Sequence, residues 1–280
     1  MSTLVPPLFA GLVDDASALP PGIASFGEVL AAHALHEGAW YHDLLGTFLM
    51  PSSLVDREFP PAGTAVGVVN DAPIGVLPAT VAKLRAAGTD VRHVEAAVAR
   101  RGEDPQPGLA ALRAFAADQD LDVYAEIPLS WGLVAALDTL AEARAGGLPI
   151  APKFRIGGLA SELFPTPVEL AAVICACRDR ELPFRLAAGL RHALRHTDPE
   201  TGFTHHGFLN VLVAVLYAVE GGEVADVAEA LAATHPVPLV EPARARRHGP
   251  RPLWRGFGTA KVMDPLTELI RLGLINGGFE

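Results

Sequence analysis

The sequence predicts an α/β fold, a single (β/α)8 barrel of the TIM type. Short apolar segments with strand character alternate with helical segments from one end of the 280-residue chain to the other. Eight such strand-like segments are present, and about 250 residues is the usual length of this barrel. Half of the residues are hydrophobic and 19% are charged, so the chain has enough apolar side chains for a large core.

Each expected strand is an apolar run that ends at a proline, a glycine or a charged residue. We expect strands at 8–13, 44–50, 64–70, 91–98, 121–127, 150–156, 183–188 and 253–261. An open, doubly wound sheet is the alternative arrangement. The sequence lacks the glycine-rich dinucleotide fingerprint of that fold, which favours the closed barrel.

Helix signals stand between the strands. Ser25 with Glu28, and Thr166 with Glu169, have the spacing of capping boxes that open helices. We expect helices at 25–37, 80–87, 107–118 and 131–145, from 166 onward, and at 210–219, 224–233 and 264–272. Asp264-Pro265 is expected to cap the last of these. The order becomes irregular after the seventh strand, and 236–252 is a Pro/Arg-rich loop long enough for a lid. We expect one domain, 1–280.

The composition of the chain argues against some classes of binding partner. A net charge of −10 argues against a nucleic-acid-binding protein, which is usually basic. The apolar stretch 208–219 is too short to span a bilayer, and no secretory signal opens the chain, so we expect a cytoplasmic protein without a membrane partner. Cys175 and Cys177 are two apart on a helix and are expected to be buried, unpaired residues. The apolar exteriors of the helices permit a homodimer.

Two basic strand ends are the main functional signal. Lys153 and Arg155 are two residues apart on the expected sixth strand and therefore point to the same face. Arg185 lies on the seventh. In a barrel the carboxyl-terminal ends of the strands carry the chemistry. We expect a cationic pocket there, with Arg155 and Arg185 binding a carboxylate or phosphate. Repulsion and burial would lower the pKa of Lys153 and make it a nucleophilic amine, whereas a structural pairing with Glu126 is the alternative.

Carboxylates also lie near the ends of the expected strands. Glu126 is a candidate general base, or the group that orients Lys153. Asp14, Glu95 and Glu126 together form an alternative set of ligands for a divalent metal, although their spacing matches no diagnostic motif. We predict no cofactor and keep the metal as the alternative. Asp14-Asp15 also fits a simple turn.

Further candidates follow the seventh strand. Histidines are concentrated between 192 and 206, and His192 and His206 are candidate proton carriers. Asn210 is either the N-cap of the next helix or a hydrogen-bond donor in the pocket. Gly157 and Gly158 end the sixth strand and are expected to contact the substrate. Gly258 ends the eighth, where barrels often bind phosphate.

Several motifs resemble a known bacterial family of uncharacterised proteins. They are the Lys153-x-Arg155-x-Gly157-Gly158 strand end, the Ala188-Gly189-Leu190-x-His192 and His206–Asn210 segments, and Asp14-Asp15-Ala16 followed by Pro20-Pro21-Gly22. That resemblance supplies no activity. At the level of the fold, the Lys-x-Arg strand end is similar to class I aldolases of the deoxyribose-phosphate type. This similarity implies a Schiff-base lysine on the sixth strand, at Lys153.

Three functions are consistent with these observations. The first is an enzyme of lyase, aldolase or isomerase type that acts on a small anionic metabolite, phosphorylated or carboxylated. The second is a metal-dependent hydrolase or lyase that uses Asp, Glu and His side chains. The third is a non-catalytic binding or scaffold protein of a biosynthetic cluster that kept the barrel and lost its chemistry.

Overall fold

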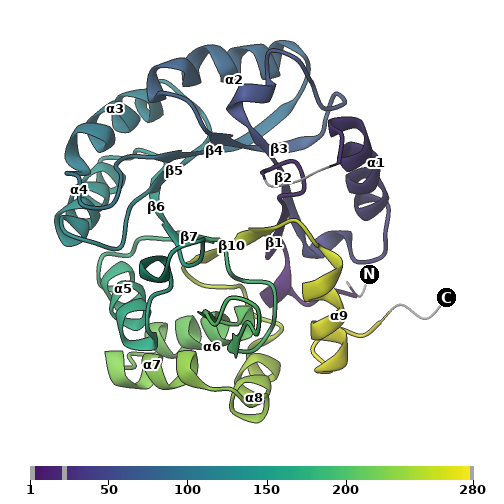
Figure 1. Ribbon diagram of the computed structural model, residues 1–280, viewed down its shortest axis with the longest axis vertical. Coiled ribbons are helices and arrows are strands. Elements are labelled where there is room, and N and C mark those ends of the chain that lie inside the picture. The colour runs from purple at the N-terminus through teal and green to yellow at the C-terminus, as the bar shows by residue number, and fades with distance from the viewer. Residues whose placement is uncertain (1–3, 21–23, 278–280) are drawn as a thin grey trace.

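The chain folds into a closed barrel of eight parallel strands, in a computed structural model that describes residues 4–20 and 24–277. The predicted fold class is confirmed. The strands follow one another around the barrel in the order β1-β10-β7-β6-β5-β4-β3-β2, inside a ring of helices (Figure 1). They are β1 (Val13–Asp15), β2 (Leu45–Pro51), β3 (Ala65–Asn70), β4 (Asp90–Ala97), β5 (Asp122–Glu126), β6 (Ile150–Arg155), β7 (Phe184–Ala187) and β10 (Trp254–Thr259).

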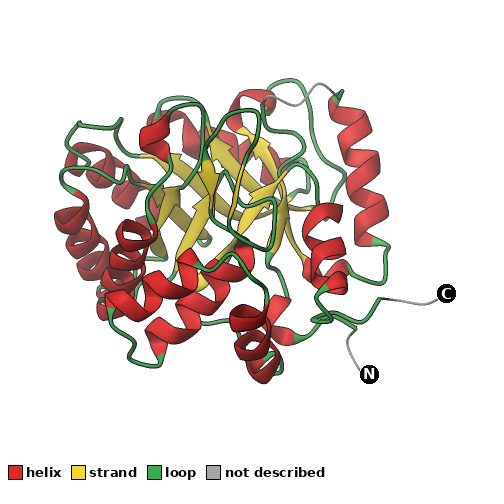
Figure 2. Ribbon diagram, turned by 60° about the horizontal axis from the view of Figure 1, so that its bottom comes forward, coloured by secondary structure: helices red, strands yellow, loops and turns green. Residues whose placement is uncertain are grey.

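The helices cover the outside of the barrel (Figure 2). Both predicted capping boxes are present, at Ser25 with Glu28 and at Thr166 with Glu169. The last helix begins one residue before Asp264, which therefore lies in its first turn and is not its cap. The helices are α1 (Phe26–Glu37), α2 (Leu77–Ala86), α3 (Gln106–Ala117), α4 (Leu133–Ala145), α5 (Pro167–Asp179), α6 (Phe208–Val219), α7 (Val224–Ala232), α8 (Val237–Arg246) and α9 (Met263–Arg271).

Alternation along the strands separates the apolar core from the polar interior. Val94, Phe154 and Phe184 are fully or almost fully buried and belong to the hydrophobic cluster between strands and helices. Each such side chain stabilises the fold by about 1.5–3 kcal/mol. Because successive side chains of a strand point to opposite faces, Lys153 and Arg185 beside them point into the barrel. The apolar pattern of the strands thus also sets the direction of the charged residues.

The irregular region after β7 begins with a sharp turn in which Ala188 and Gly189 have positive φ angles of 61° and 80°. A short antiparallel hairpin follows, made of β8 (His196–Thr197) and β9 (Thr204–His205). The chain then forms α6, α7 and α8 before it returns to the barrel at β10. These helices lie together on one side of the barrel in Figure 1.

The segment 236–252 is not the loop that its composition predicts. Most of it is α8, in which Pro238 occupies the first turn, where a missing N–H costs nothing, and Pro242 is tolerated inside the helix. The carbonyl of Arg247 accepts a hydrogen bond from the N–H of Leu8. Because the segment leads into the amino-terminal end of β10, it lies at the opposite end of the barrel from the mouth and cannot be a lid.

The first expected strand is also displaced. Residues Pro7–Phe9 form a 3-10 turn, and Gly11 turns the chain with a φ of 57° before β1 starts at Val13. This apolar run closes the amino-terminal end of the barrel and is tied there by Arg251. The Arg251 guanidinium donates hydrogen bonds of 2.9–3.1 Å to the carbonyls of Leu8, Ala10 and Gly11.

The cysteines and the apolar helices carry two further expectations. Cys175 and Cys177 are buried and unpaired, as predicted. Over the part of the chain that the structure describes, no helix is long and apolar enough to cross a membrane. Pro21 and Gly22, from the motif after Asp14-Asp15-Ala16, lie outside the described residues.

Candidate active site

Charged side chains from five strands meet inside the carboxyl-terminal half of the barrel. Lys153 of β6 is in register with Glu126 of β5 on one side and with Arg185 of β7 on the other. Glu95 of β4 and Asp14 of β1 complete the group. Lys153 and Arg185 point into the same space, as their alternation predicts.

Lys153 lies between two carboxylates. Its Nζ is 2.8 Å from Oε2 of Glu95 and 2.8 Å from Oε2 of Glu126. The Lys153 side chain is 5% exposed and that of Glu95 is 3% exposed, so this part of the cluster is removed from solvent. The pairing with Glu126 that the sequence left open is therefore present, and Glu95 is a second partner.

Arg185 connects Glu95 to the first strand. Its Nε is 3.0 Å from Oε1 of Glu95, and its Nη2 contacts Oδ2 of Asp14. The other oxygen of Asp14 accepts hydrogen bonds from the backbone N–H of Thr47, at 2.7 Å, and from its hydroxyl, at 3.0 Å. Arg185 is buried, so it holds the interior of the barrel together and is not exposed to bind a substrate at the mouth.

The Asp14-Asp15 pair does not form a turn, because both residues belong to β1. They point to opposite faces, as neighbours on a strand must. Asp14 points into the barrel, whereas Asp15 points outward and lies 3.0 Å from Nδ1 of His33 on α1. Asp15 and His33 are both buried, so this contact attaches α1 to the barrel.

The charges alternate along one continuous chain of contacts. The order is Asp14, Arg185, Glu95, Lys153, Glu126 and Arg155, and Nε of Arg155 is 3.1 Å from Oε1 of Glu126. Three cations thus face three carboxylates. The cluster is neutral in sum, which differs from the cationic pocket that the basic strand ends suggested.

These contacts set the protonation of the cluster. Burial by itself would lower the pKa of Lys153, but the charges of Glu95 and Glu126 outweigh it, and the pKa lies above its ordinary value. Burial likewise opposes the ionisation of Glu95, and Lys153 and His93 overcome it and hold the pKa of Glu95 at about 2. The expectation of a lowered Lys153 pKa is therefore wrong for the free protein. Burial lowers the pKa of Arg185 to about 9, so it remains charged at neutral pH.

One layer deeper in the barrel, an imidazole and a phenol support the charges. His93 precedes Glu95 by two residues on β4, and its Nε2 is 3.4 Å from Oε1 of that carboxylate. The ring of Tyr124 packs edge-on against His93, and the Arg185 guanidinium carbon is 5.2 Å from the Tyr124 ring centre. A side chain at Gly67 would overlap the His93 ring, so glycine is needed there to make room.

At the mouth, the cluster borders a small cavity of about 140 Å³. Glu126 and Arg155 form part of its wall, and 46% of the Arg155 side chain is exposed. Arg101, four residues after the end of β4, also contributes to the wall and is not among the site residues predicted from the sequence. Its position after the fourth strand, in Arg100-Arg101-Gly102, was the available signal. Arg155 and Arg101 can thus meet a ligand at the mouth, whereas Arg185 cannot.

The two candidate histidines lie apart from the charged cluster. His206 is 1% exposed, and its Nε2 donates a hydrogen bond to the carbonyl of Pro165 at 2.8 Å. Burial lowers the pKa of His206 to about 4 and keeps the ring neutral. His192 is half exposed and lies 2.7 Å from Oε1 of Glu268 on α9. The first contact attaches the region after β7 to the segment before α5, and the second attaches it to α9.

Asn210 neither caps a helix nor offers a free amide. Gly207 is the N-cap of α6, and Asn210 lies within that helix with no exposed surface. Its side-chain oxygen accepts from the N–H of Arg195 at 2.8 Å. Its nitrogen donates to the carbonyls of Ala230 and Ala233 at 2.8 and 2.7 Å. The amide joins α6 to α7 and to the segment after β7.

The candidate glycines allow close packing. A Cβ on Gly157 would lie 3.0 Å from the backbone of Gly189, so the ends of β6 and β7 approach each other there. A Cβ on Gly158 would overlap Leu163. One on Gly258 would lie 2.8 Å from a methyl group of Leu49 inside the barrel. The space beside Gly158 and Gly258 is filled by side chains, which leaves no phosphate cradle at these two positions.

The alternative metal ligands are engaged by cations. Lys153 lies between Glu95 and Glu126, and Arg185 lies between Glu95 and Asp14. Among residues 4–20 and 24–277, no group of three or more His, Cys, Asp or Glu side chains could hold a metal ion. The three carboxylates therefore serve as partners of the basic side chains in this arrangement.

No family model, curated protein or solved structure matches the chain. The function has to be inferred from the chemistry of the site itself.

Proposed function

We propose that the protein is an enzyme of lyase or isomerase type that acts on a small anionic carbonyl compound, with Lys153 as the reactive amine. One observation carries the proposal. A buried lysine lies at the carboxyl-terminal end of a barrel strand, between two carboxylates 2.8 Å away. In barrel enzymes this end of the strands is where catalytic residues lie.

The residue type at this position supports the proposal. The chain has three lysines and nineteen arginines. Lys83 and Lys261 are exposed at the surface, whereas Lys153 is buried. An ion pair alone would be served equally well by an arginine, which is the more common basic residue here. A lysine differs from an arginine in that its amine can lose a proton and attack a carbonyl.

The two carboxylates suit the covalent chemistry even though they keep Lys153 protonated at rest. The ammonium must first pass a proton to Glu126, which is an uphill step because the pKa of Lys153 is raised and that of Glu126 is lowered at rest, and the Nζ lone pair then attacks the substrate carbonyl carbon. The carbonyl oxygen takes that proton, and water leaves with one further proton from the nitrogen. The product is an iminium cation, whose positive charge lies where the ammonium charge was. Glu95 and Glu126, already placed around a cation, therefore also stabilise the iminium.

The iminium then takes up the electron pair of a bond to the adjacent carbon and becomes an enamine. If that bond is C–H, Glu126 takes the proton and returns it to another carbon, which is an isomerisation; if it is C–C, the other fragment leaves as a carbonyl compound whose hydroxyl proton goes to Glu126, which is a lyase reaction. Water then hydrolyses the adduct, which releases the product and restores the Lys153 amine. Glu126 is the group closest to both Lys153 and the mouth, so it is our candidate for the proton transfers. Arg155 and Arg101, which border the mouth cavity, are the candidates for binding the anionic group of the substrate.

Borohydride trapping tests the proposal. The protein is incubated with pyruvate, glyoxylate or glyceraldehyde 3-phosphate, then reduced and digested, and the three lysine-containing peptides are compared by mass. We expect the peptide with Lys153 to gain the mass of the reduced adduct. A Lys261→Met variant should keep this adduct and a Lys153→Met variant should lose it, with circular dichroism as the check on folding. Adducts on Lys83 and Lys261 alone, across the panel, would refute the covalent mechanism.

A second candidate is a non-catalytic binding or scaffold protein. The observation that favours it is the balance of the cluster, in which each cation already has a carboxylate partner. Such a network can serve the structure alone. It predicts no adduct at Lys153 with any carbonyl compound, and a Lys153→Met variant that keeps the biological activity of the wild type.

A further inference from the structure

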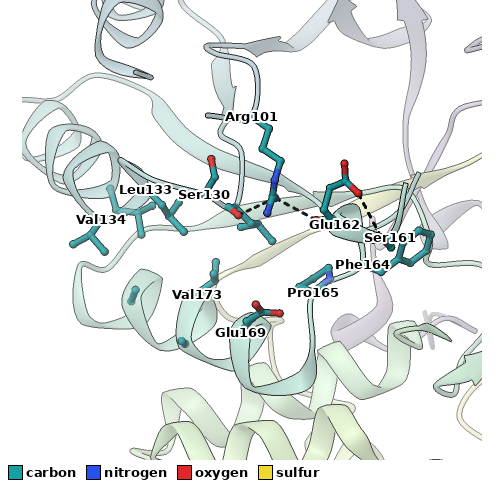
Figure 3. A pocket seen from close by; sticks show the side chains of 14 residues that line it. Arg101, Ser130, Leu133, Val134, Ser161, Glu162, Phe164, Pro165, Glu169 and Val173 are labelled. Atoms are coloured by element: carbon teal, nitrogen blue, oxygen red, sulfur yellow. Dashed lines mark hydrogen bonds between the residues drawn. The ribbon is translucent and has the colours of Figure 1, made fainter. Parts of the chain in front are cut away.

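A groove on the outside of the barrel lies next to the candidate active site. It runs between α4 and α5 and has a volume of about 570 Å³. Figure 3 shows Leu133 and Val134 of α4 on one side of it and Val173 of α5 on the other. Leu137, Ala172 and Ala176 continue this apolar lining along the two helices. We refer to it as the α4/α5 groove.

The α4/α5 groove and the mouth cavity share one wall. Arg101, Leu129 and Glu162 line both of them. Within this wall, Nη1 of Arg101 donates hydrogen bonds to the carbonyl of Leu129 at 3.1 Å and to that of Glu162 at 3.2 Å (Figure 3). The Glu162 side chain is exposed and can turn away without disturbing the core, whereas Leu129 packs against the core and keeps its place in the wall.

The sizes of the two spaces complement each other. Pockets that bind small molecules usually measure about 300–1,000 Å³. At about 140 Å³ the mouth cavity is below this range, whereas the groove at about 570 Å³ lies within it. Both spaces are lined by charged and apolar residues, but Glu126 and Arg155 line only the mouth cavity, whereas the apolar stretch along α4 and α5 lines only the groove. A ligand that fills both has a small charged head and an apolar tail.

We infer that the substrate is amphiphilic, a carboxylate whose apolar chain or ring occupies the α4/α5 groove while its head lies in the mouth cavity. Arg101 and Arg155 flank the head; Nε of Arg155 is already used by Glu126, which leaves its terminal nitrogens for a carboxylate. The inference deepens the proposed function, on which it rests for the chemistry of the head.

The position of the groove favours a small amphiphile over a protein partner. One end of it lies against Arg101 and Glu162 at the mouth, so an occupant of the groove meets the charged site. Val134, which lines the groove, is an exposed apolar side chain and would also suit a second copy of the chain. That occupant is tested as an outcome of the same experiment.

Straight-chain carboxylates without a ketone or aldehyde group cannot react with Lys153, so their binding tests the groove independently of catalysis. The affinities of butyrate, hexanoate and octanoate are measured by calorimetry. We expect the affinity to rise about fourfold for each added methylene, the ratio for burying one methylene. Octanoate should therefore bind on the order of 200-fold more tightly than butyrate. Octanoate that binds no better than butyrate would overturn the inference.

A blocking variant locates the tail. Ala172 is exposed on α5 and lines the groove, so Ala172→Trp should fill it and remove the dependence on chain length. Ala32→Trp, at an exposed alanine of α1, is the matched control and should keep the dependence. Chain-length dependence that survives Ala172→Trp would place the tail elsewhere and refute the inference. A wild-type dimer that Ala172→Trp turns into a monomer would also refute it, in favour of a second copy.

The covalent mechanism and the amphiphilic substrate can be refuted independently of each other. Tight binding of octanoate without any borohydride adduct at Lys153 would support the groove and refute the covalent mechanism. An adduct from pyruvate at Lys153, together with no chain-length dependence, would support the mechanism and refute the amphiphilic substrate.

Discussion

Replacing Glu95 by Gln tests whether the buried charge cluster stabilises the barrel. The change keeps the shape of the side chain and removes a charge that contacts both Lys153 and Arg185. Removing one partner from a buried ion pair costs about 3–5 kcal/mol. The pKa of Glu95, lowered from 4.5 to about 2, corresponds to about 3 kcal/mol by linkage. We therefore expect Glu95→Gln to lose about 3 kcal/mol at pH 7, and roughly 6–12 °C in Tm.

The pH dependence of this loss identifies its cause. The pKa of Glu95 is lower in the folded than in the unfolded protein, so its contribution is complete above about pH 5 and is lost as the pH falls toward 2. About 1.4 kcal/mol of it should be gone by pH 3.5. The free-energy difference between wild type and Glu95→Gln should shrink by that amount.

Urea denaturation between pH 8 and pH 3.5, followed by circular dichroism, measures both quantities. Glu58→Gln, at an exposed carboxylate between β2 and β3, is the control and should stay within about 0.5 kcal/mol of wild type. A Glu95→Gln variant as stable as wild type at pH 7 would refute the reasoning. So would a deficit of equal size at every pH, because it would come from packing and not from the charge.

Three further predictions concern stability. Asn210→Leu should lose about 3 kcal/mol in urea denaturation, because it leaves the buried N–H and carbonyl partners of this amide unpaired; an unchanged midpoint would contradict the contacts. Gly67→Ala should lose about 1–3 kcal/mol through overlap with His93 and Leu49, and less in a His93→Ala background, where only the overlap with Leu49 remains, which a double-mutant cycle measures. Arg251→Met should lower the unfolding free energy by about 3 kcal/mol and leave borohydride trapping at Lys153 intact; a loss of trapping in a folded variant would link the two ends of the barrel.

Loop, cap and proton-carrier predictions at three places are wrong for physical reasons that local sequence does not show. Proline and arginine content suggested a loop at 236–252, but proline is tolerated in a first helical turn, and α8 contains one there. Asn210 stands close to a helix start and so resembled a cap, although the helix begins two residues earlier. Histidine ordinarily titrates near neutral pH, which makes His206 a candidate proton carrier. Burial against the carbonyl of Pro165 removes this property, and no local pattern shows burial by a distant segment.

The sequence by itself determined the barrel and the direction of its charged residues. Apolar alternation defines the strands, and a period of two places Lys153 and Arg155 on the inward face of β6. Only the tertiary structure decided what these charges do. Closure of the barrel brings Asp14 of the first strand to Arg185 and Glu95 to Lys153. Because the Coulomb interaction between two charges weakens as their separation grows, these short distances set the protonation of the cluster. Arg101 and the α4/α5 groove likewise arise from loops and helices that meet only when the barrel closes.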